Sequence, residues 1–207
     1  LLRCGGIGCG LYRFDTAPVC LLPMSAKTQT LLRGARDTVP MLIGALPFGL
    51  IFGTLAVASG LSLPATLLMS ALVFAGSAQF IAVSLVASGA GLVVLLLTTF
   101  IVNLRHMLYS ASLMSHVRHL PQRWKIPLAF WLTDESFAVV HRHYLDPHPP
   151  KELKHWYYLG SCLAIYSNWF ICTLLGALLG NALPGLADWG LDFAMVATFT
   201  GIVVPLL

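Results

Sequence analysis

Two adjacent acidic residues inside an apolar segment are the strongest candidates for chemistry in this chain. Asp134 and Glu135 are the only charged residues between positions 127 and 140. Neighbouring side chains on a helix point about 100° apart, so at least one carboxylate needs a cation as partner in an apolar medium. Such a carboxylate readily takes up a proton, which suits proton coupling or the binding of an ammonium group. The alternative is an acidic pair that caps a short helix at a membrane surface.

Arg105 is the first candidate for that partner. It directly follows the longest uncharged stretch of the chain, residues 38–104, and Asn103, His106 and Tyr109 lie within about one helical turn of it. An arginine inside a bilayer core costs about 3 kcal/mol on insertion scales, so it needs a partner there. The alternative is an arginine that anchors a helix end at the cytoplasmic surface.

Small and neutral polar residues suggest where helices could be interrupted. Ser77 and Gln79 can supply neutral hydrogen-bonding groups beside Gly76, and an unwound helix there would present its N-terminus to a carboxylate. Proline removes a backbone donor and glycine tolerates unwound backbone, so we predict broken helices at Pro47, Gly49 and Gly76. For each residue alone, the alternative is ordinary close packing between helices.

The composition identifies the medium that must surround these residues. Apolar residues make up 57% of the 207 residues and charged residues only 10%, whereas about 25% are charged in soluble domains. The uncharged stretch 38–104 is long enough for roughly three membrane spans, and further uncharged runs cover 156–187 and 193–207. We therefore predict an all-α polytopic membrane protein with about six apolar helices, some of them broken or re-entrant.

The basic residues raise a topological problem. They cluster before the first apolar run, between 118 and 125, and between 142 and 154. If all three clusters face the cytoplasm, as the positive-inside rule favours, an even number of crossings must separate them. However, three apolar segments lie between the first two clusters and one short segment between the last two. Segments that enter the membrane without crossing it resolve the conflict.

Several classes of function lose support. The sequence has no phosphate-binding loop, no paired-histidine or paired-cysteine metal pattern and no serine-hydrolase elbow. Its basic residues are scattered over short loops, which disfavours nucleic-acid binding. We expect no metal, no cofactor and no catalytic residue. Two alternatives stay open: an intramembrane enzyme that uses Asp134, Glu135 and His106 as acid and base, and an assembly subunit whose polar residues only hold helices together.

Four motifs carry a resemblance to a known family. In chain order they are PFGLIFG (47–53), AGSAQF (75–80), NLRHMLYS (103–110) and LTDESF (132–137). Together they resemble the AzlC family of branched-chain amino-acid permeases. The resemblance implies the large subunit of a two-component exporter of neutral amino acids such as valine, leucine, isoleucine and methionine, in the bacterial cytoplasmic membrane. It also implies a small hydrophobic AzlD-type partner subunit.

The resemblance also bears on the domain organisation. Residues 1–23 precede the first methionine and have no place in the family pattern, so we interpret them as a non-native or mis-started extension. Residues 24–207 are predicted to form a single transmembrane transporter domain. The chain stops short of the family's last hydrophobic segment, which predicts a truncated C-terminus.

For a transporter of this kind, the candidate residues take specific roles. We expect a secondary transporter driven by the proton gradient. The ammonium group of the substrate would bind Asp134 or Glu135, and its carboxylate would bind a broken-helix end near Pro47 or Gly76. Arg105 would hold the acidic pair when the site is empty.

Overall fold

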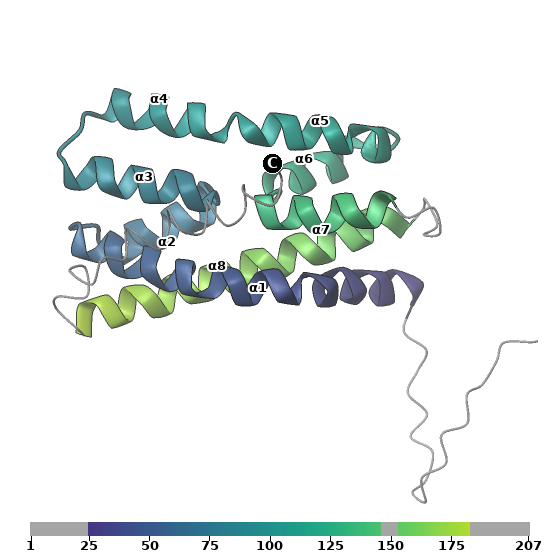
Figure 1. The fold of residues 1–207 in the computed structure, drawn as a ribbon, viewed down its shortest axis with the longest axis horizontal. Coiled ribbons are helices and arrows are strands. Elements are labelled where there is room, and N and C mark those ends of the chain that lie inside the picture. Colours follow the sequence, from purple (N-terminus) through teal and green to yellow (C-terminus); the bar gives the residue numbers. More distant parts are fainter. Residues whose placement is uncertain (1–24, 146–152, 183–207) are drawn as a thin grey trace, which may run out of the picture.

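The computed structural model describes residues 25–145 and 153–182, in which helices are the only regular secondary structure (Figure 1). The prediction of an all-α membrane protein is confirmed. The predictions for residues 1–23 and for the C-terminal end lie outside the described residues. The helices are α1 (Ala26–Ala58), α2 (Leu63–Leu72), α3 (Gly76–Ala87), α4 (Leu92–Asn103), α5 (Arg105–Val117), α6 (Gln122–Phe130), α7 (Asp134–Leu145) and α8 (Lys154–Ala182).

Within the described residues, 3 helical segments are long and apolar enough to cross a membrane. They are Ala26–Ala58, Leu92–Val117 and Lys154–Gly180, and the second consists of α4 and α5 together. Two shorter apolar helices, α2 and α3, cannot span a bilayer by length. The predicted count of about six apolar helices is therefore not confirmed.

A pair of parallel helices, α1 and α8, forms the centre of the fold (Figure 1). Glycines bring the two backbones together, because a Cβ atom at these positions would collide with a backbone carbonyl of the other helix. Hydroxyl groups then bridge the helices: Thr54 donates to the carbonyl oxygen of Gly176 at 2.9 Å, and Thr38 donates to Ser161 Oγ at 2.7 Å. Small residues and interhelical hydrogen bonds commonly join membrane helices. The glycines are Gly34 and Gly53 of α1 and Gly160 and Gly176 of α8.

This packing corrects one prediction from the sequence. Pro47 and Gly49 lie inside α1, which is helical from Ala26 to Ala58, so the prediction of a broken helix at these two residues is wrong. A Cβ atom at Gly49 would lie 2.6 Å from Cys172 Cβ of α8. Gly49 therefore serves close helix packing, and α8 supports the backbone of α1 along this stretch.

Two helical hairpins, α2–α3 and α6–α7, enter the fold from opposite ends and turn back at its middle (Figure 1). Their helices have 9 to 12 residues, or about 14–18 Å each, which is roughly half of a hydrocarbon core about 30 Å thick. The chain reverses at 73–75 in the first hairpin, where Phe74 has a φ of 29°, and at 131–133 in the second. This arrangement agrees with the prediction of re-entrant segments.

The chain reversals at 73–75 and 131–133, together with the first turns of α3 and α7 that follow them, are called the hairpin tips here. Both tips lie beside the middle of α8. The ring of Tyr166 lies 4.8 Å from the ring of Phe74, in the first tip, and 5.9 Å from the ring of Trp131, in the second. Gly76 packs so closely against Trp169 that a Cβ atom there would lie 3.0 Å from the indole ring. One turn of α8 therefore holds both tips at the same depth.

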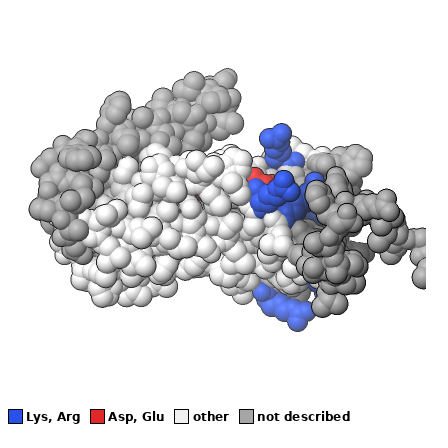
Figure 2. Space-filling model, turned by 90° about the horizontal axis from the view of Figure 1, so that it is seen from below, with Lys and Arg blue, Asp and Glu red and all other residues white. Residues whose placement is uncertain are grey.

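The hairpins resolve the topological problem posed by the basic clusters. In the part of the chain that the structure describes, the three candidate spans and the two short hairpins bring the start of α1, the α5–α6 turn and the start of α8 to one end of the molecule (Figure 1). Figure 2 shows lysine and arginine side chains gathered toward one end. The turns at the other end, residues 59–62 and 88–91, carry no charge. The positive-inside rule favours the basic end as the cytoplasmic one.

The elements also repeat in an inverted order. α1 crosses away from the basic end and is followed by the α2–α3 hairpin, which enters from the uncharged end (Figure 1). α4 and α5 cross in the opposite direction and are followed by the α6–α7 hairpin, which enters from the basic end. Inverted repeats of this kind place binding sites near mid-membrane in many secondary transporters.

The close packing of α1 and α8 can be tested with an added methyl group. Gly176→Ala should lower the thermal unfolding midpoint, because the methyl group would collide with the carbonyl of Leu50, and overpacking costs about 1–3 kcal/mol. Gly44→Ala is the matched control, since a Cβ atom there meets nothing within 4 Å. Tryptophan fluorescence of the detergent-solubilised protein measures the midpoint. Equal midpoints for the two variants would contradict the close packing.

Candidate functional site

Arg105 lies at the middle of a candidate membrane span. It stands 13 residues after Leu92 and 12 residues before Val117, the ends of the span formed by α4 and α5. The helix is irregular just before it, where the Leu104 amide bonds to the carbonyl of Ile101 rather than to that of residue 100. The alternative of an arginine anchored at the membrane surface is therefore not supported by its position.

The side chain of Arg105 joins the two hairpin tips. Its Nη2 lies 3.1 Å from Asp134 Oδ2, at the start of α7, and donates to Ser77 Oγ, in the first turn of α3, at 2.6 Å. The side chains of Arg105 and Asp134 are 21% and 28% exposed. A partly buried ion pair with further hydrogen bonds is favourable, whereas loss of either partner leaves a costly charge behind.

Asp134 is held from a second direction. Tyr109, one turn after Arg105 in α5, donates its hydroxyl to Asp134 Oδ1 at 2.7 Å. The phenol ring stacks on Phe137 of α7, with centroids 4.5 Å apart. Both oxygens of the Asp134 carboxylate therefore contact side chains of α5. These contacts hold the tip of the α6–α7 hairpin against α5.

A local cap explains why α7 starts at this acidic residue. The Thr133 amide donates to Ser136 Oγ at 2.8 Å, and the Ser136 amide donates to Thr133 Oγ1 at 3.3 Å. This reciprocal pattern is a capping box, and it places Asp134 and Glu135 in the first turn, where the helix dipole stabilises acids. The acidic pair does begin a short helix, and that helix start lies beside the middle of the candidate span formed by α4 and α5.

A small cavity separates the two tips. Its volume is about 20 Å³, enough for one water molecule and far below the roughly 300 Å³ of an ordinary small-molecule pocket. In this conformation the tips are closed on each other, so a larger ligand could enter only if they moved apart. The cavity is lined by Phe74, Ala75, Gly76, Arg105, His106, Thr133, Asp134, Glu135, Ile165 and Trp169.

The other predicted residues are divided between this cavity and its surroundings. His106 lines the cavity, and its Nδ1 lies 3.1 Å from the backbone oxygen of Asn103. Gln79 belongs to a separate buried polar cluster, in which its Nε2 donates to Ser70 Oγ at 3.2 Å and Ser70 lies 2.9 Å from Thr173 Oγ1. The structure thus brings together Arg105, Asp134, Glu135, Ser77, Tyr109, His106 and Gly76, and it leaves Gln79 one hydrogen-bonded cluster away.

Some polar atoms around the tips are buried without a hydrogen-bonding partner. In the part of the chain that the structure describes, they include Gln79 Oε1, Asn103 Oδ1 and Trp169 Nε1. Such atoms are rare in folded proteins and commonly indicate bound water or a ligand. The sequence does not predict that Trp169 lies at this site, because a tryptophan in an apolar helix is usually a packing residue and no neighbouring motif distinguishes it.

Metal binding finds no support in the described ranges 25–145 and 153–182. No group of three or more histidine, cysteine, aspartate or glutamate side chains there is arranged to hold a metal ion. Cys162 and Cys172 are free, buried thiols that face the packed interior.

The family can now be assigned by comparison. Residues 40–183 match the family described as AzlC protein. The chain belongs to the AzlC family. The matched region contains the whole of α2 to α7, with both hairpin tips, Arg105 and Asp134.

Individual relatives agree with this assignment. The chain is 29% identical over 167 residues to the branched-chain amino acid transport protein AzlC of Bacillus subtilis, covering 81% of this chain and 64% of the relative. It is 31% identical over 157 residues to the inner membrane protein YgaZ of Escherichia coli, covering 75% and 63%. An uncharacterized membrane protein of Helicobacter pylori is 32% identical over 165 residues, covering 78% and 69%. No solved structure matches the chain significantly.

These comparisons confirm the resemblance carried by the four motifs and support a membrane transport role. The chain spans about two thirds of the length of these relatives, with 64%, 63% and 69% of each covered.

The contacts of Asp134 with Arg105 and Tyr109 should contribute measurably to the stability of the protein. Asp134→Asn should lower the free energy of unfolding by about 2–4 kcal/mol, somewhat less than for a fully buried pair, because Arg105 would lose its carboxylate. Tyr109→Phe removes one hydrogen bond and should cost about 1 kcal/mol. Arg33→Gln is the control, since its 3.8 Å ion pair with Asp37 joins side chains that are 66% and 41% exposed.

Chemical unfolding in detergent micelles measures these differences. The control should change the free energy of unfolding by less than about 0.5 kcal/mol. The double variant Arg105→Gln/Asp134→Asn should lose less stability than the sum of the single variants, because the two side chains are coupled. Strict additivity would contradict the ion pair.

Proposed function

We propose that this chain is the large subunit of a secondary transporter that exports branched-chain and similar neutral amino acids across the bacterial cytoplasmic membrane. Its partner would be a small hydrophobic AzlD-type subunit, and export would be coupled to protons. The observation that carries the proposal is the contact of one mid-span arginine with two hairpin tips that enter from opposite ends. Broken helices around polar groups at mid-membrane are typical of transporter binding sites.

Each end of a zwitterionic amino acid has a complementary group at the tips. Asp134 or Glu135 would bind the ammonium group. The first turn of α3 would bind the carboxylate, because its N-cap residue, Ala75, supplies no side-chain hydrogen bond to the amide groups of that turn. Arg105 holds Asp134 in the empty site and already contacts Ser77 in that turn. Pro47 offers no helix end to the substrate carboxylate, since α1 is continuous there.

The two hairpins provide the parts for alternating access. The closed cavity of about 20 Å³ excludes an amino acid in this conformation. Movement of the α2–α3 tip would break the Arg105–Ser77 contact and open the cavity toward the uncharged end of the molecule. Movement of the α6–α7 tip would break the Arg105–Asp134 contact and open it toward the basic end. The site would then face one side at a time.

Proton coupling would use the second carboxylate. Glu135 lines the same cavity as Asp134 and Arg105, and the guanidinium of Arg105 is paired with Asp134. Two carboxylates beside a single cation favour the uptake of one proton. We assign Asp134, Glu135 and His106 to binding and coupling rather than to catalysis, in keeping with the transport family.

Efflux of radiolabelled leucine tests the proposal. In cells that lack other exporters and produce the chain with its small partner, Asp134→Asn should reduce efflux about a hundredfold, since it removes one of the two carboxylates proposed to bind the ammonium group and also the partner of Arg105. Arg118→Gln, an exposed basic residue outside the site, should keep normal efflux. A chemically altered product would indicate an enzyme. Unchanged efflux with Asp134→Asn would indicate an assembly subunit, and either result would overturn the proposal.

Selectivity gives a second test. The substrate side chain would need only an apolar pocket, and one methylene group in such a pocket is worth about 1–3 kcal/mol. Efflux of valine, leucine, isoleucine and methionine should therefore differ by factors below about 200 at equal concentration. Competition assays in the same cells measure these ratios. Export of isoleucine with complete exclusion of valine would contradict the proposed pocket.

A further inference from the structure

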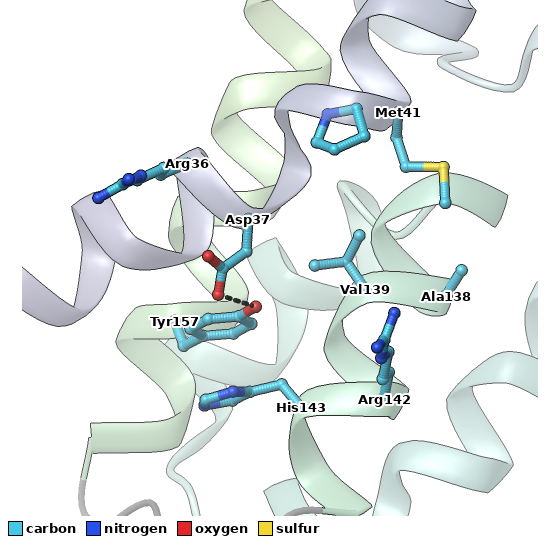
Figure 3. A pocket seen from close by; sticks show the side chains of 9 residues that line it. Arg36, Asp37, Met41, Ala138, Val139, Arg142, His143 and Tyr157 are labelled. Atoms are coloured by element: carbon cyan, nitrogen blue, oxygen red, sulfur yellow. Dashed lines mark hydrogen bonds between the residues drawn. The ribbon is translucent and has the colours of Figure 1, made fainter.

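A second, larger cavity lies at the basic end of the molecule. It is a groove of about 700 Å³ between α1, α7 and the first turns of α8 (Figure 3). Unlike the central cavity, it is large enough for a small-molecule ligand without any movement of the hairpins. It is lined by Arg36, Asp37, Pro40, Met41, Ala138, Val139, Arg142, His143 and Tyr157.

The lining combines both signs of charge with an apolar wall. Asp37 supplies a carboxylate from α1, and Arg142 extends from α7 into the space between the two helices (Figure 3). Met41 lies across the groove from Val139 and Ala138. An acidic group, a basic group and aliphatic side chains in one groove match a zwitterion that carries an aliphatic side chain.

The acidic group is held in place and not neutralised by the arginine opposite. Tyr157 donates its hydroxyl to Asp37 Oδ2 at 2.9 Å, and its ring stacks on His143 with centroids 3.6 Å apart. The ion pair of Asp37 with Arg33 is long, at 3.8 Å, and exposed. Among the described residues, no ion pair within 4.0 Å joins Asp37 to Arg142. Asp37 and Arg142 therefore both line the groove without forming an ion pair with each other.

We propose that this groove is a cytoplasmic loading site for amino acids with aliphatic side chains. Asp37 binds the ammonium group, Arg142 binds the carboxylate, and Met41 and Val139 contact the side chain. This inference rests on the transport function proposed above and adds a site separate from the central one. Ala138, at the inner part of the groove, is one helical turn from Asp134 on α7, or about 6 Å along the helix axis. A substrate in the groove is thus one turn from the central site.

An anionic phospholipid is the competing occupant, because Arg36 and Arg142 lie at the cytoplasmic surface, where lipid headgroups are found. Asp37 argues against it, since a carboxylate within the groove repels a phosphate group and attracts an ammonium group. The charge pattern therefore favours the zwitterion.

Transport kinetics test the loading site in the same efflux cells. Arg142→Gln and Asp37→Asn should each raise the cytoplasmic leucine concentration for half-maximal efflux about tenfold, since each removes one charged hydrogen bond. The maximal rate should stay within about twofold, because the central site is intact. Arg123→Gln is the matched control, an exposed arginine at the same end that does not line the groove. It should change neither quantity.

The outcomes separate this inference from the proposed function. If Asp134→Asn abolishes efflux while Arg142→Gln and Asp37→Asn leave the half-maximal concentration unchanged, the loading site is wrong and the transporter proposal stands. If Asp134→Asn leaves efflux intact, the transporter proposal itself fails.

Binding to the purified full chain with its partner identifies the ligand. Leucine binding should weaken about tenfold in Arg142→Gln, whereas binding of leucinamide, which has no carboxylate, should not respond to that change. The competing lipid is tested by comparing the stability of the natural chain and of Arg142→Gln in nanodiscs with and without phosphatidylglycerol. If phosphatidylglycerol stabilises the natural chain but not Arg142→Gln, and leucine binds both equally, the groove is a lipid site and the inference is overturned.

Discussion

The described structure depends on the placement of one guanidinium at mid-membrane. Arg105 is costly in that position unless its charge is compensated. The compensation comes from Asp134 of the α6–α7 hairpin and Ser77 of the α2–α3 hairpin, two segments that are far apart in the sequence. Neither segment spans the bilayer. Compensation of the charge on Arg105 therefore favours an arrangement in which both hairpins reach the centre, where the starts of α3 and α7 line one cavity.

The parallel pair of α1 and α8 provides the rigid support for that centre. Glycines at the crossing allow backbone contact, which leaves little freedom for one helix to slide along the other. α8 then offers Tyr166 and Trp169 as a common surface for both tips. The tips can move only by leaving this surface, so motion is expected in the hairpins rather than in the central pair.

The sequence predicts the charged pair but not everything around it. The pairing of Arg105 with Asp134 follows from the cost of isolated charges in an apolar medium, and re-entrant segments follow from the parity of the basic clusters. The error at Pro47 and Gly49 has a different origin. A glycine that allows unwinding and a glycine that allows close packing look the same in one sequence, and only the position of α8 distinguishes them. Trp169 is missed for the same reason, since its role depends on which helices surround it.

The two bonds of Arg105 are unequal, and this inequality sets an order for the proposed transport cycle. The bond to Ser77 joins a charge to a neutral hydroxyl, worth about 1.5–3 kcal/mol, whereas separation from Asp134 would leave two opposite charges unpaired in an apolar medium. The empty protein should therefore open the α2–α3 tip, toward the uncharged end, more easily than the α6–α7 tip. In the proposed cycle, opening toward the basic end would require a cation that replaces Arg105 at Asp134. The ammonium group of an amino acid that moves from Asp37 in the proposed loading groove to Asp134 would be such a cation, so loading and opening would be coupled by the same charge.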